Sequence, residues 1–253
     1  MRTPARVDRA RDFTELTRAQ PLAGSRGRDC GARSEPLVFG RVVRLSPRWQ
    51  SLDALAAAHP EPRLDLGCGF AKPPGFIGID DGRGELAQVA NENGPDIYLD
   101  LQESPLPFAD DSVEEVRASH LLEHLSHGFE HVLSETRRVL RPGGIFLFAV
   151  PYANSADGLM PGHQLFLTED YFDKSQWFDE LFVIVNADWD PTPEWERLPS
   201  RFRDEIGFDL ARRVMFNVCA QMKIWVTPRK GEWLDAPRRT CAEAARLFQP
   251  VAG

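Results

Sequence analysis

The sequence has no long hydrophobic run and few cysteines. A transmembrane helix needs about 20 consecutive apolar residues, and no segment approaches that length. The first residues, Met1–Pro4, lead into no apolar signal-peptide segment. The four cysteines lie far apart without a C-x-x-C pair, so neither a zinc knuckle nor a disulfide framework is indicated. We therefore expect a cytoplasmic protein without a membrane span.

Lysine is absent from the first 50 residues, whereas arginine occurs there 11 times against 5 acidic residues. This segment carries a net charge of +6, although the net charge of the whole chain is −8. Nucleic-acid affinity rests on many Lys and Arg contacts to phosphate, so the acidic remainder argues against a nucleic-acid partner. We expect residues 1–45 to form a mobile basic extension.

Short apolar runs alternate with helical patterns in the middle of the chain. They predict a helix at about 128–140 and strands at 63–66, 76–79, 96–100, 113–119 and 144–150. Two later apolar stretches, 181–185 and 214–226, are candidates for an antiparallel pair at the sheet edge. This order predicts an α/β fold, a Rossmann-like doubly wound, mostly parallel sheet of about seven strands with an antiparallel edge strand.

The same pattern divides the chain into three parts. Residues 1–45 are the basic extension, in which 37–45 could be a short strand or a helix. A central domain at 46–230 begins with a helix capped by Ser46-Pro47 and contains a loop-rich, acidic cap insertion at about 154–213. Residues 231–253 form a C-terminal tail or helix.

A glycine-rich loop, Asp65-Leu66-Gly67-Cys68-Gly69, follows the first of these strands. A dinucleotide fingerprint needs a third glycine where Lys72 stands, and no Walker sequence follows either. An acid before the glycines suits a ligand with an amino or cationic group. Only nine residues join the first two strands, too few for a normal crossover helix.

Further motifs follow this loop in order. The sequence has L-D-L-G-C-G at 64–69, P-F-x-D-x-S-x-x-x-V at 107–116, S-H-x-L-E-H at 119–124 and L-R-P-G-G at 140–144. In register they resemble the small methyltransferase-domain type of the class I S-adenosylmethionine-dependent methyltransferases, over about residues 62–152. The resemblance implies that S-adenosyl-L-methionine is the cofactor.

The resemblance also implies roles for individual positions. Asp80 would accept both ribose hydroxyls, and Asp100 with the backbone of Leu101 would meet the adenine amino edge. Ser119 would lie near the sulfonium. The residues that would line the methionine end of the cofactor are Asp65, Gly67, Cys68 and Gly69. Each of the acids at 80 and 100 could instead be a plain turn residue.

Two histidines are candidate catalytic residues. His120 could be a general base near the methyl group, or it could serve packing or cofactor positioning. His163 precedes an F-x-T-x-x-x-F segment that related enzymes place over the active site, and we expect this segment to close over the cofactor. Residues 120–124 also match H-x-x-E-H, a zinc-protease pattern, but the motif follows a strand rather than lying in a long helix. We therefore expect no metal.

The motifs that the sequence lacks narrow the class of methyl acceptor. No Pro-Cys nucleophile and no D/N-P-P-Y/F motif follows the fourth strand, which disfavours base methylation. Aromatic residues between 166 and 195 are either ordinary packing or a pocket for a small acceptor. The leading hypothesis is methyl transfer to a small-molecule or glycan acceptor at oxygen. The alternatives are a non-catalytic methyltransferase-like binding protein and an RNA methyltransferase that uses the basic arm. The oligomeric state cannot be read from the sequence.

Overall fold

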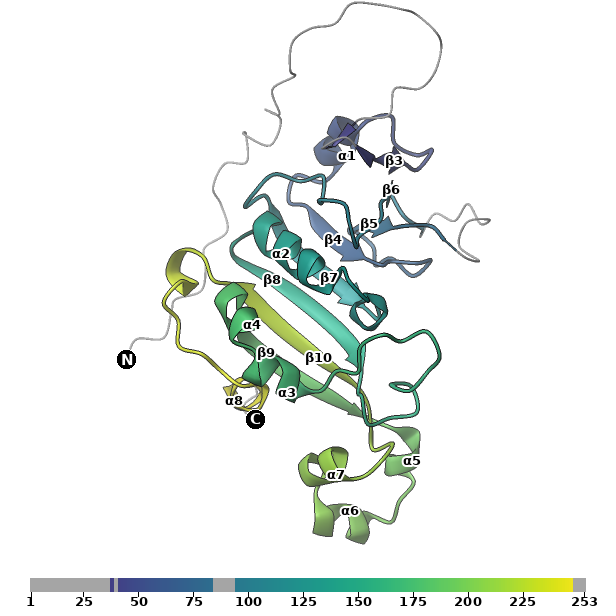
Figure 1. The fold of residues 1–253 in the computed structure, drawn as a ribbon, viewed down its shortest axis with the longest axis vertical. Helices are drawn as coiled ribbons and strands as arrows, with labels where there is room; N and C mark the ends of the chain where they lie inside the picture. The colour runs from purple at the N-terminus through teal and green to yellow at the C-terminus, as the bar shows by residue number, and fades with distance from the viewer. Residues whose placement is uncertain (1–36, 39–40, 84–93, 248–253) are drawn as a thin grey trace, which may run out of the picture.

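The computed structural model describes residues 37–38, 41–83 and 94–247, and its centre is an eight-stranded β-sheet (Figure 1). The strand order is β3-β6-β5-β4-β7-β8-β10-β9. The strands are β3 (Arg44–Leu45), β4 (Arg63–Leu66), β5 (Ile77–Asp80), β6 (Ile97–Tyr98), β7 (Val113–Ser119), β8 (Leu140–Pro151), β9 (Phe182–Pro191) and β10 (Cys219–Pro228).

Five neighbouring strands, from β6 to β8, are parallel. Strand β10 runs antiparallel between β8 and β9, and β3 is antiparallel to β6. The expected Rossmann-like, mostly parallel sheet is confirmed, with eight strands and antiparallel pairing at both edges. In such a sheet ligands gather at the carboxyl ends of the parallel strands, which here are the ends of β4 to β7.

The additional strand comes from the segment that could have been strand or helix. It forms β3 and a separate antiparallel pair, β1 (Leu37–Val38) with β2 (Arg41–Val42). Leu45 pairs with Ile97, and the Arg44 guanidinium lies 3.8 Å from the centre of the Tyr98 ring. The basic extension was expected to reach residue 45, but its last two residues belong to the sheet. Residues 1–36 of that extension, and the weak helical pattern at 84–93, lie outside the described residues.

The first helix begins later than its sequence indicates. Helix α1 spans Leu52–Ala58, and its N-cap is Ser51, whose Oγ accepts a hydrogen bond from the Ala54 amide at 3.1 Å. The expected cap, Ser46, instead donates its amide to the carbonyl of Asp96 at 2.9 Å. The capping prediction was therefore wrong because residue 46 continues the edge of the sheet.

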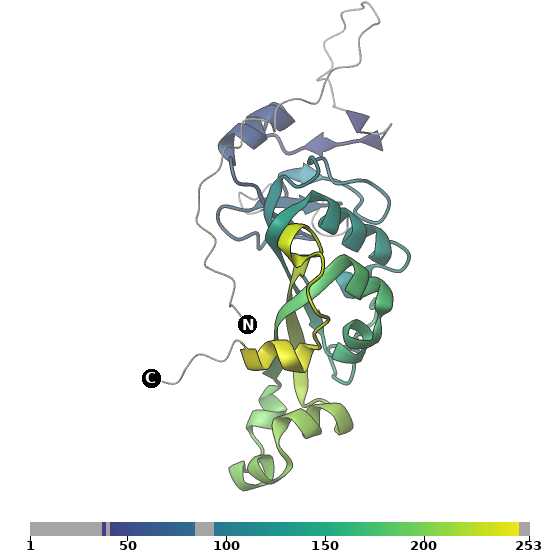
Figure 2. The ribbon, with the colours of Figure 1, turned by 90° about the vertical axis from the view of Figure 1, so that its left-hand side faces the viewer.

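Helix α2 (Phe129–Val139) confirms the amphipathic pattern at about 128–140. Its buried side chains recur three or four residues apart, so they form one apolar face; they are Phe129, Val132, Leu133, Thr136 and Val139. Helices α3 (Glu169–Lys174) and α4 (Gln176–Leu181) lie on the same side of the sheet as α2 (Figure 2).

Two of the late aromatic residues are core residues. Phe172 and Phe178 are each 1% exposed, and their ring centres lie 5.1 and 6.4 Å from that of Phe148 on β8. Trp195 packs elsewhere, in a small cluster with Ala211 and Val218. The aromatic residues therefore do not form one cap, and for these three the packing interpretation holds.

The segment expected to be a cap insertion, about 154–213, is partly sheet. It contains α3, α4 and β9, followed by α5 (Pro193–Glu196), α6 (Ser200–Ile206) and α7 (Phe208–Val214). The apolar stretch from Val214 was expected to be a strand throughout, but β10 begins only at Cys219 because residue 214 ends a helix. After β10 come a 3-10 turn, η3 (Gly231–Trp233), and α8 (Cys241–Leu247), which packs against β9.

Within the described residues, the helices are all too short or too polar to cross a lipid bilayer.

Candidate functional site

The glycine loop joins β4 directly to β5 without a helix, as its length predicted. Gly67 and Gly69 have φ of +64° and +49°, in the left-handed backbone region that residues other than glycine rarely occupy. The Gly67 amide donates to the carbonyl of Ile79 at 2.8 Å, which folds the loop back on β5. A Cβ on Gly67 would lie 2.9 Å from Cδ1 of Leu121, so the loop also packs closely on the segment after β7.

Asp80 ends β5 with its carboxylate between two loops. Its Oδ2 accepts the Gly69 amide at 3.2 Å, and its Oδ1 accepts the Gly82 amide at 2.8 Å. The residue is 8% exposed. Each carboxylate oxygen has a further lone pair, so both can still accept hydrogen bonds from a diol.

Asp65 lies on β4, immediately before the loop, and its side chain is 5% exposed. Burial raises the pKa of this carboxyl to about 6, although Arg117, whose Nε lies 3.8 Å from Oδ1, and Lys72 both favour the ionised form. A buried acid that is only partly compensated by cations favours a cationic group nearby. Arg117 carried no signal in the sequence, because its pairing with residue 65 depends on the register of β4 against β7.

Cys68 belongs to the loop, and its side chain is buried. Its side chain is 5% exposed, and burial raises the pKa of the thiol far above its ordinary value, so it remains a neutral thiol. A Cβ added to Gly78 would lie 2.7 Å from the Cys68 Sγ, so the thiol packs directly on β5. Contact between this residue and a ligand would therefore come from its backbone.

Asp100 follows β6 and is held by two donors. Its Oδ2 accepts from Arg83 at 2.7 Å, and its Oδ1 accepts the Gln102 amide at 3.1 Å. Leu101, beside it, is 7% exposed. The arginine also lies 3.4 Å from Asp81, so it joins the ends of β5 and β6, a link that the sequence did not reveal.

His120 follows β7 directly in the left-handed backbone region, with φ of +53°. Its Nε2 lies 2.9 Å from Oε1 of Gln221 on β10, and its Nδ1 lies 3.4 Å from Oε1 of Glu123. The neighbouring Glu123 raises the pKa of His120. The ring is about half exposed, and both of its nitrogens face acceptor oxygens. Ser119, the last residue of β7, is half-buried beside it. No sequence pattern indicated Gln221, which comes from a strand 101 residues later.

His163 lies beside His124, with ring centres 4.8 Å apart. Its loop is attached to the chain after β7, because the amides of Gln164 and Leu165 donate to the Glu123 carbonyl at 2.7 and 3.1 Å. Both predicted catalytic histidines thus lie next to η2 (Leu122–His124), since His120 precedes it in the chain and the loop of His163 is hydrogen-bonded to it.

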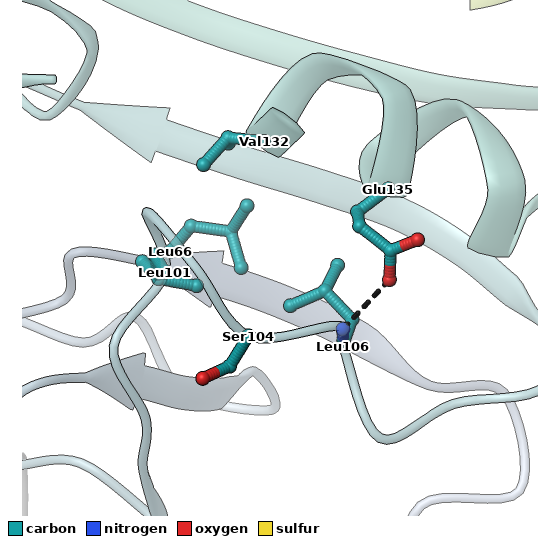
Figure 3. A pocket seen from close by; sticks show the side chains of 6 residues that line it. All are labelled: Leu66, Leu101, Ser104, Leu106, Val132 and Glu135. Carbon is teal, nitrogen blue, oxygen red and sulfur yellow. Dashed lines mark hydrogen bonds between the residues drawn. The ribbon is translucent and has the colours of Figure 1, made fainter. Parts of the chain in front are cut away.

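Two cavities can be compared with this arrangement of residues. One, between the chain after β6 and helix α2, is too small to hold a water molecule, and Glu135 closes it by accepting the Leu106 amide at 2.8 Å (Figure 3). The other, of about 770 Å³, lies between β9, α7 and α8. Of the predicted cofactor residues, Leu101 lines the first cavity, and none lines the second.

Comparison with known proteins agrees with this arrangement. Residues 64–148 match the family described as methyltransferase domain. An uncharacterized methyltransferase of Mycobacterium marinum is 36% identical over 73 residues, which cover 28% of this chain and 28% of that protein. An uncharacterized 37.1 kDa protein in transposon TN4556 of Streptomyces fradiae is 39% identical over 114 residues, covering 40% of this chain and 33% of that protein. The chain thus spans a third or less of the length of these curated relatives.

The fold has a counterpart among solved structures. A SAM-dependent methyltransferase from Archaeoglobus fulgidus aligns with a TM-score of 0.52 and 16% identity, covering 70% of this chain and 92% of that one. At this identity the likeness concerns the fold. The chain is thus similar to S-adenosylmethionine-dependent methyltransferases in its fold, and residues 64–148 match a methyltransferase domain.

Proposed function

We propose that the chain is an enzyme that transfers a methyl group from S-adenosyl-L-methionine to a small-molecule or glycan acceptor, at oxygen. The observation that carries the cofactor assignment is the presence of two buried carboxylates, Asp65 and Asp80, near the carboxyl ends of the neighbouring strands β4 and β5. One would meet the amino group of the cofactor and the other its ribose hydroxyls. Between them, the left-handed backbone at Gly67 and Gly69 leaves no side chain to block the approach.

When bound, this cofactor supplies an activated methyl group on a sulfonium, which an acceptor attacks in line. The protein then mainly holds the acceptor on that line, an effect worth up to about 7 to 11 kcal/mol. Asp65 and Asp80 would hold the two ends of the nucleoside amino acid, and Ser119 at the end of β7 would border the space for the reacting atoms.

His120 is the candidate for proton handling at the acceptor. Glu123 lies behind its Nδ1 and would stabilise the imidazolium that forms when the ring takes a hydroxyl proton. Gln221 holds the ring by Nε2, and its own amide is fixed by donation to Asp190 at 2.5 Å. As a base, His120 would have to release one of these contacts, so a positioning role stays open beside the catalytic one.

A small acceptor is favoured by charge. Between residues 169 and 210 acids outnumber bases 12 to 4, which opposes the docking of a polyanion near the end of the sheet. The proposal is therefore tested by incubating the full chain with labelled cofactor and a metabolite extract. We expect S-adenosylhomocysteine release together with label transfer to a low-molecular-weight product.

Two results would contradict this proposal. Tight binding of S-adenosylhomocysteine without transfer to any acceptor would favour a non-catalytic binding protein. Label transfer to RNA that is lost on deletion of residues 1–36 would favour the RNA methyltransferase.

A further inference from the structure

We propose that Glu123, His124 and His163 form a binding site for a divalent transition-metal ion. Each offers one ligand atom, and the three atoms lie within 4.8 Å of one another. The first two residues belong to η2, and the third comes from the loop about 40 residues later. A Zn²⁺ ion with bonds of about 2.0 to 2.2 Å would need the atoms to close by roughly 1 Å, which side-chain rotation can supply.

The buried carboxylate is the first independent observation. Glu123 is 1% exposed, and in the described part of the chain neither of its carboxylate oxygens has a hydrogen-bond partner. The nearby His120 Nδ1, at 3.4 Å from Oε1, does not meet hydrogen-bond geometry and forms an ion pair with Glu123 only when the ring is protonated. A buried carboxylate is costly unless it is paired or coordinates a metal. The vacant lone pairs of this side chain therefore point to a cation.

The two imidazoles are held in a state suited to metal binding. His124 Nδ1 lies 3.3 Å from the carbonyl oxygen of Gly162, and His163 Nδ1 lies 3.3 Å from that of Gly158. A carbonyl can only accept, so each Nδ1 carries the proton and each Nε2 keeps its lone pair. Metal-binding histidines are oriented in the same way, by donation from the other ring nitrogen.

The backbone keeps the two halves of the site together. The Glu123 carbonyl accepts the amides of Gln164 and Leu165, the two residues after His163. At the other end of the loop, Ser155 is fully buried and its Oγ accepts the amide of Gly158 at 2.8 Å. The approach of the two segments is therefore built into the fold, while the His124 side chain is exposed and that of His163 is half-buried.

The donor set indicates the kind of ion. Two imidazole nitrogens and one carboxylate suit Zn²⁺, Fe²⁺ and related ions, whereas Mg²⁺ and Ca²⁺ prefer oxygen ligands. Three protein ligands leave coordination positions for water or an oxygen of the acceptor. Binding of the ion stands on the geometry alone; a part in orienting the acceptor rests on the proposed methyl transfer.

The test is titration of the purified, metal-stripped full chain with Zn²⁺ by calorimetry, with thermal unfolding as a second readout. We expect one bound ion and a rise in Tm, since an ion that binds only the folded state stabilises it. His163→Ala and, separately, His124→Ala should weaken Zn²⁺ binding at least tenfold and abolish the rise in Tm. Glu123→Gln should weaken it as well.

The matched control is His127→Ala. That histidine lies three residues after His124, its side chain is 64% exposed, and it is 3.8 Å from Glu103. It should bind Zn²⁺ like the parent. Cobalt(II) substitution adds a spectroscopic readout, because nitrogen and oxygen ligands give no thiolate charge-transfer band.

Three outcomes would overturn the site: no Zn²⁺ binding by the parent, equal affinity in the His163 and His124 variants, or a thiolate band that assigns the ion to a cysteine. These results are independent of methyl transfer, so failure of the metal site and failure of the proposed function can be distinguished.

Discussion

The backbone amide of Gly69 donates a hydrogen bond to Oδ2 of Asp80 at 3.2 Å. This contact joins the loop after β4 to the end of β5, and it brings the two segments assigned to the cofactor into one unit. The two strands are neighbours in the sheet, and the carboxylate adds a direct contact between the loop and the end of β5.

Replacement of Asp80 tests the ribose assignment. Asp80→Asn should weaken S-adenosylhomocysteine binding by roughly 10- to 150-fold, since a hydrogen bond to a charged group is worth about 1.5 to 3 kcal/mol. Calorimetry gives the Kd, and circular dichroism checks the fold. Asp81→Asn is the control, because that neighbour is exposed and contacts Arg83 instead. An unchanged Kd in Asp80→Asn would show that the ribose lies elsewhere.

The raised pKa of Asp65 predicts a pH dependence of cofactor affinity. The free carboxyl titrates near pH 6, and its ionised form is the one that attracts the amino group of the cofactor. The Kd for S-adenosylhomocysteine should be constant above about pH 7 and should rise toward tenfold per unit as the pH falls below about 6. Asp65→Asn should bind more weakly at pH 7.5 and lack this acidic slope. A parent protein whose Kd is flat between pH 5 and pH 8 would contradict the assignment.

His120→Ala should lower kcat by about 100-fold or more, the range that a general base contributes, and change cofactor affinity little. His120→Gln can keep a hydrogen bond but cannot take a proton, so a base role predicts that it is as slow as the alanine variant. Steady-state kinetics with the identified acceptor measures both. A kcat for His120→Gln near that of the parent would assign positioning, and weakened cofactor binding at unchanged kcat would remove His120 from the reaction.

Gly78→Ala should lower stability by about 1 to 3 kcal/mol, because the new Cβ would lie 2.7 Å from the Cys68 Sγ and 2.8 Å from the Lys72 Cδ. Thermal or urea unfolding measures the loss. The double variant, in which Gly78→Ala is combined with Cys68→Ala, lacks the sulfur and should regain part of the lost stability. If the loss of stability in the double variant equals the sum of the losses in the two single variants, the thiol is not the obstacle.

Arg212→Met should destabilise the protein by about 3 to 5 kcal/mol, since it leaves the buried carboxylate of Glu169 without its main partner. The arginine is 1% exposed and donates to that carboxylate, which also accepts the Tyr152 hydroxyl at 2.8 Å. Arg213→Met is the matched control: it also contacts Glu169, at 3.1 Å, but is 47% exposed and should cost much less. Urea and thermal unfolding measure the loss of stability in each variant. Equal Tm values for the two variants would contradict the role assigned to Arg212.

Periodicity and motif order in the sequence determined the general architecture. Alternating strands and helices predicted the parallel sheet, and the length of the 67–75 connection predicted a loop without a helix. Both are local properties of the chain. The glycine loop and the acids at 65, 80 and 100 could likewise be found by sequence, because each follows or precedes an apolar run that marks a strand end.

The tertiary structure decided what lies next to these residues. The strand at 44–45 and the start of α1 at Leu52 depend on pairing with β6, which overrides the local cap at Ser46. Gln221 reaches His120 only through the antiparallel register of β10. The expectation of no metal rested on the position of H-x-x-E-H after a strand rather than in a long helix. Folding brings His163 against Glu123 and His124 because the loop after β8 is bound to η2 by backbone hydrogen bonds, and no spacing in the chain encodes that contact.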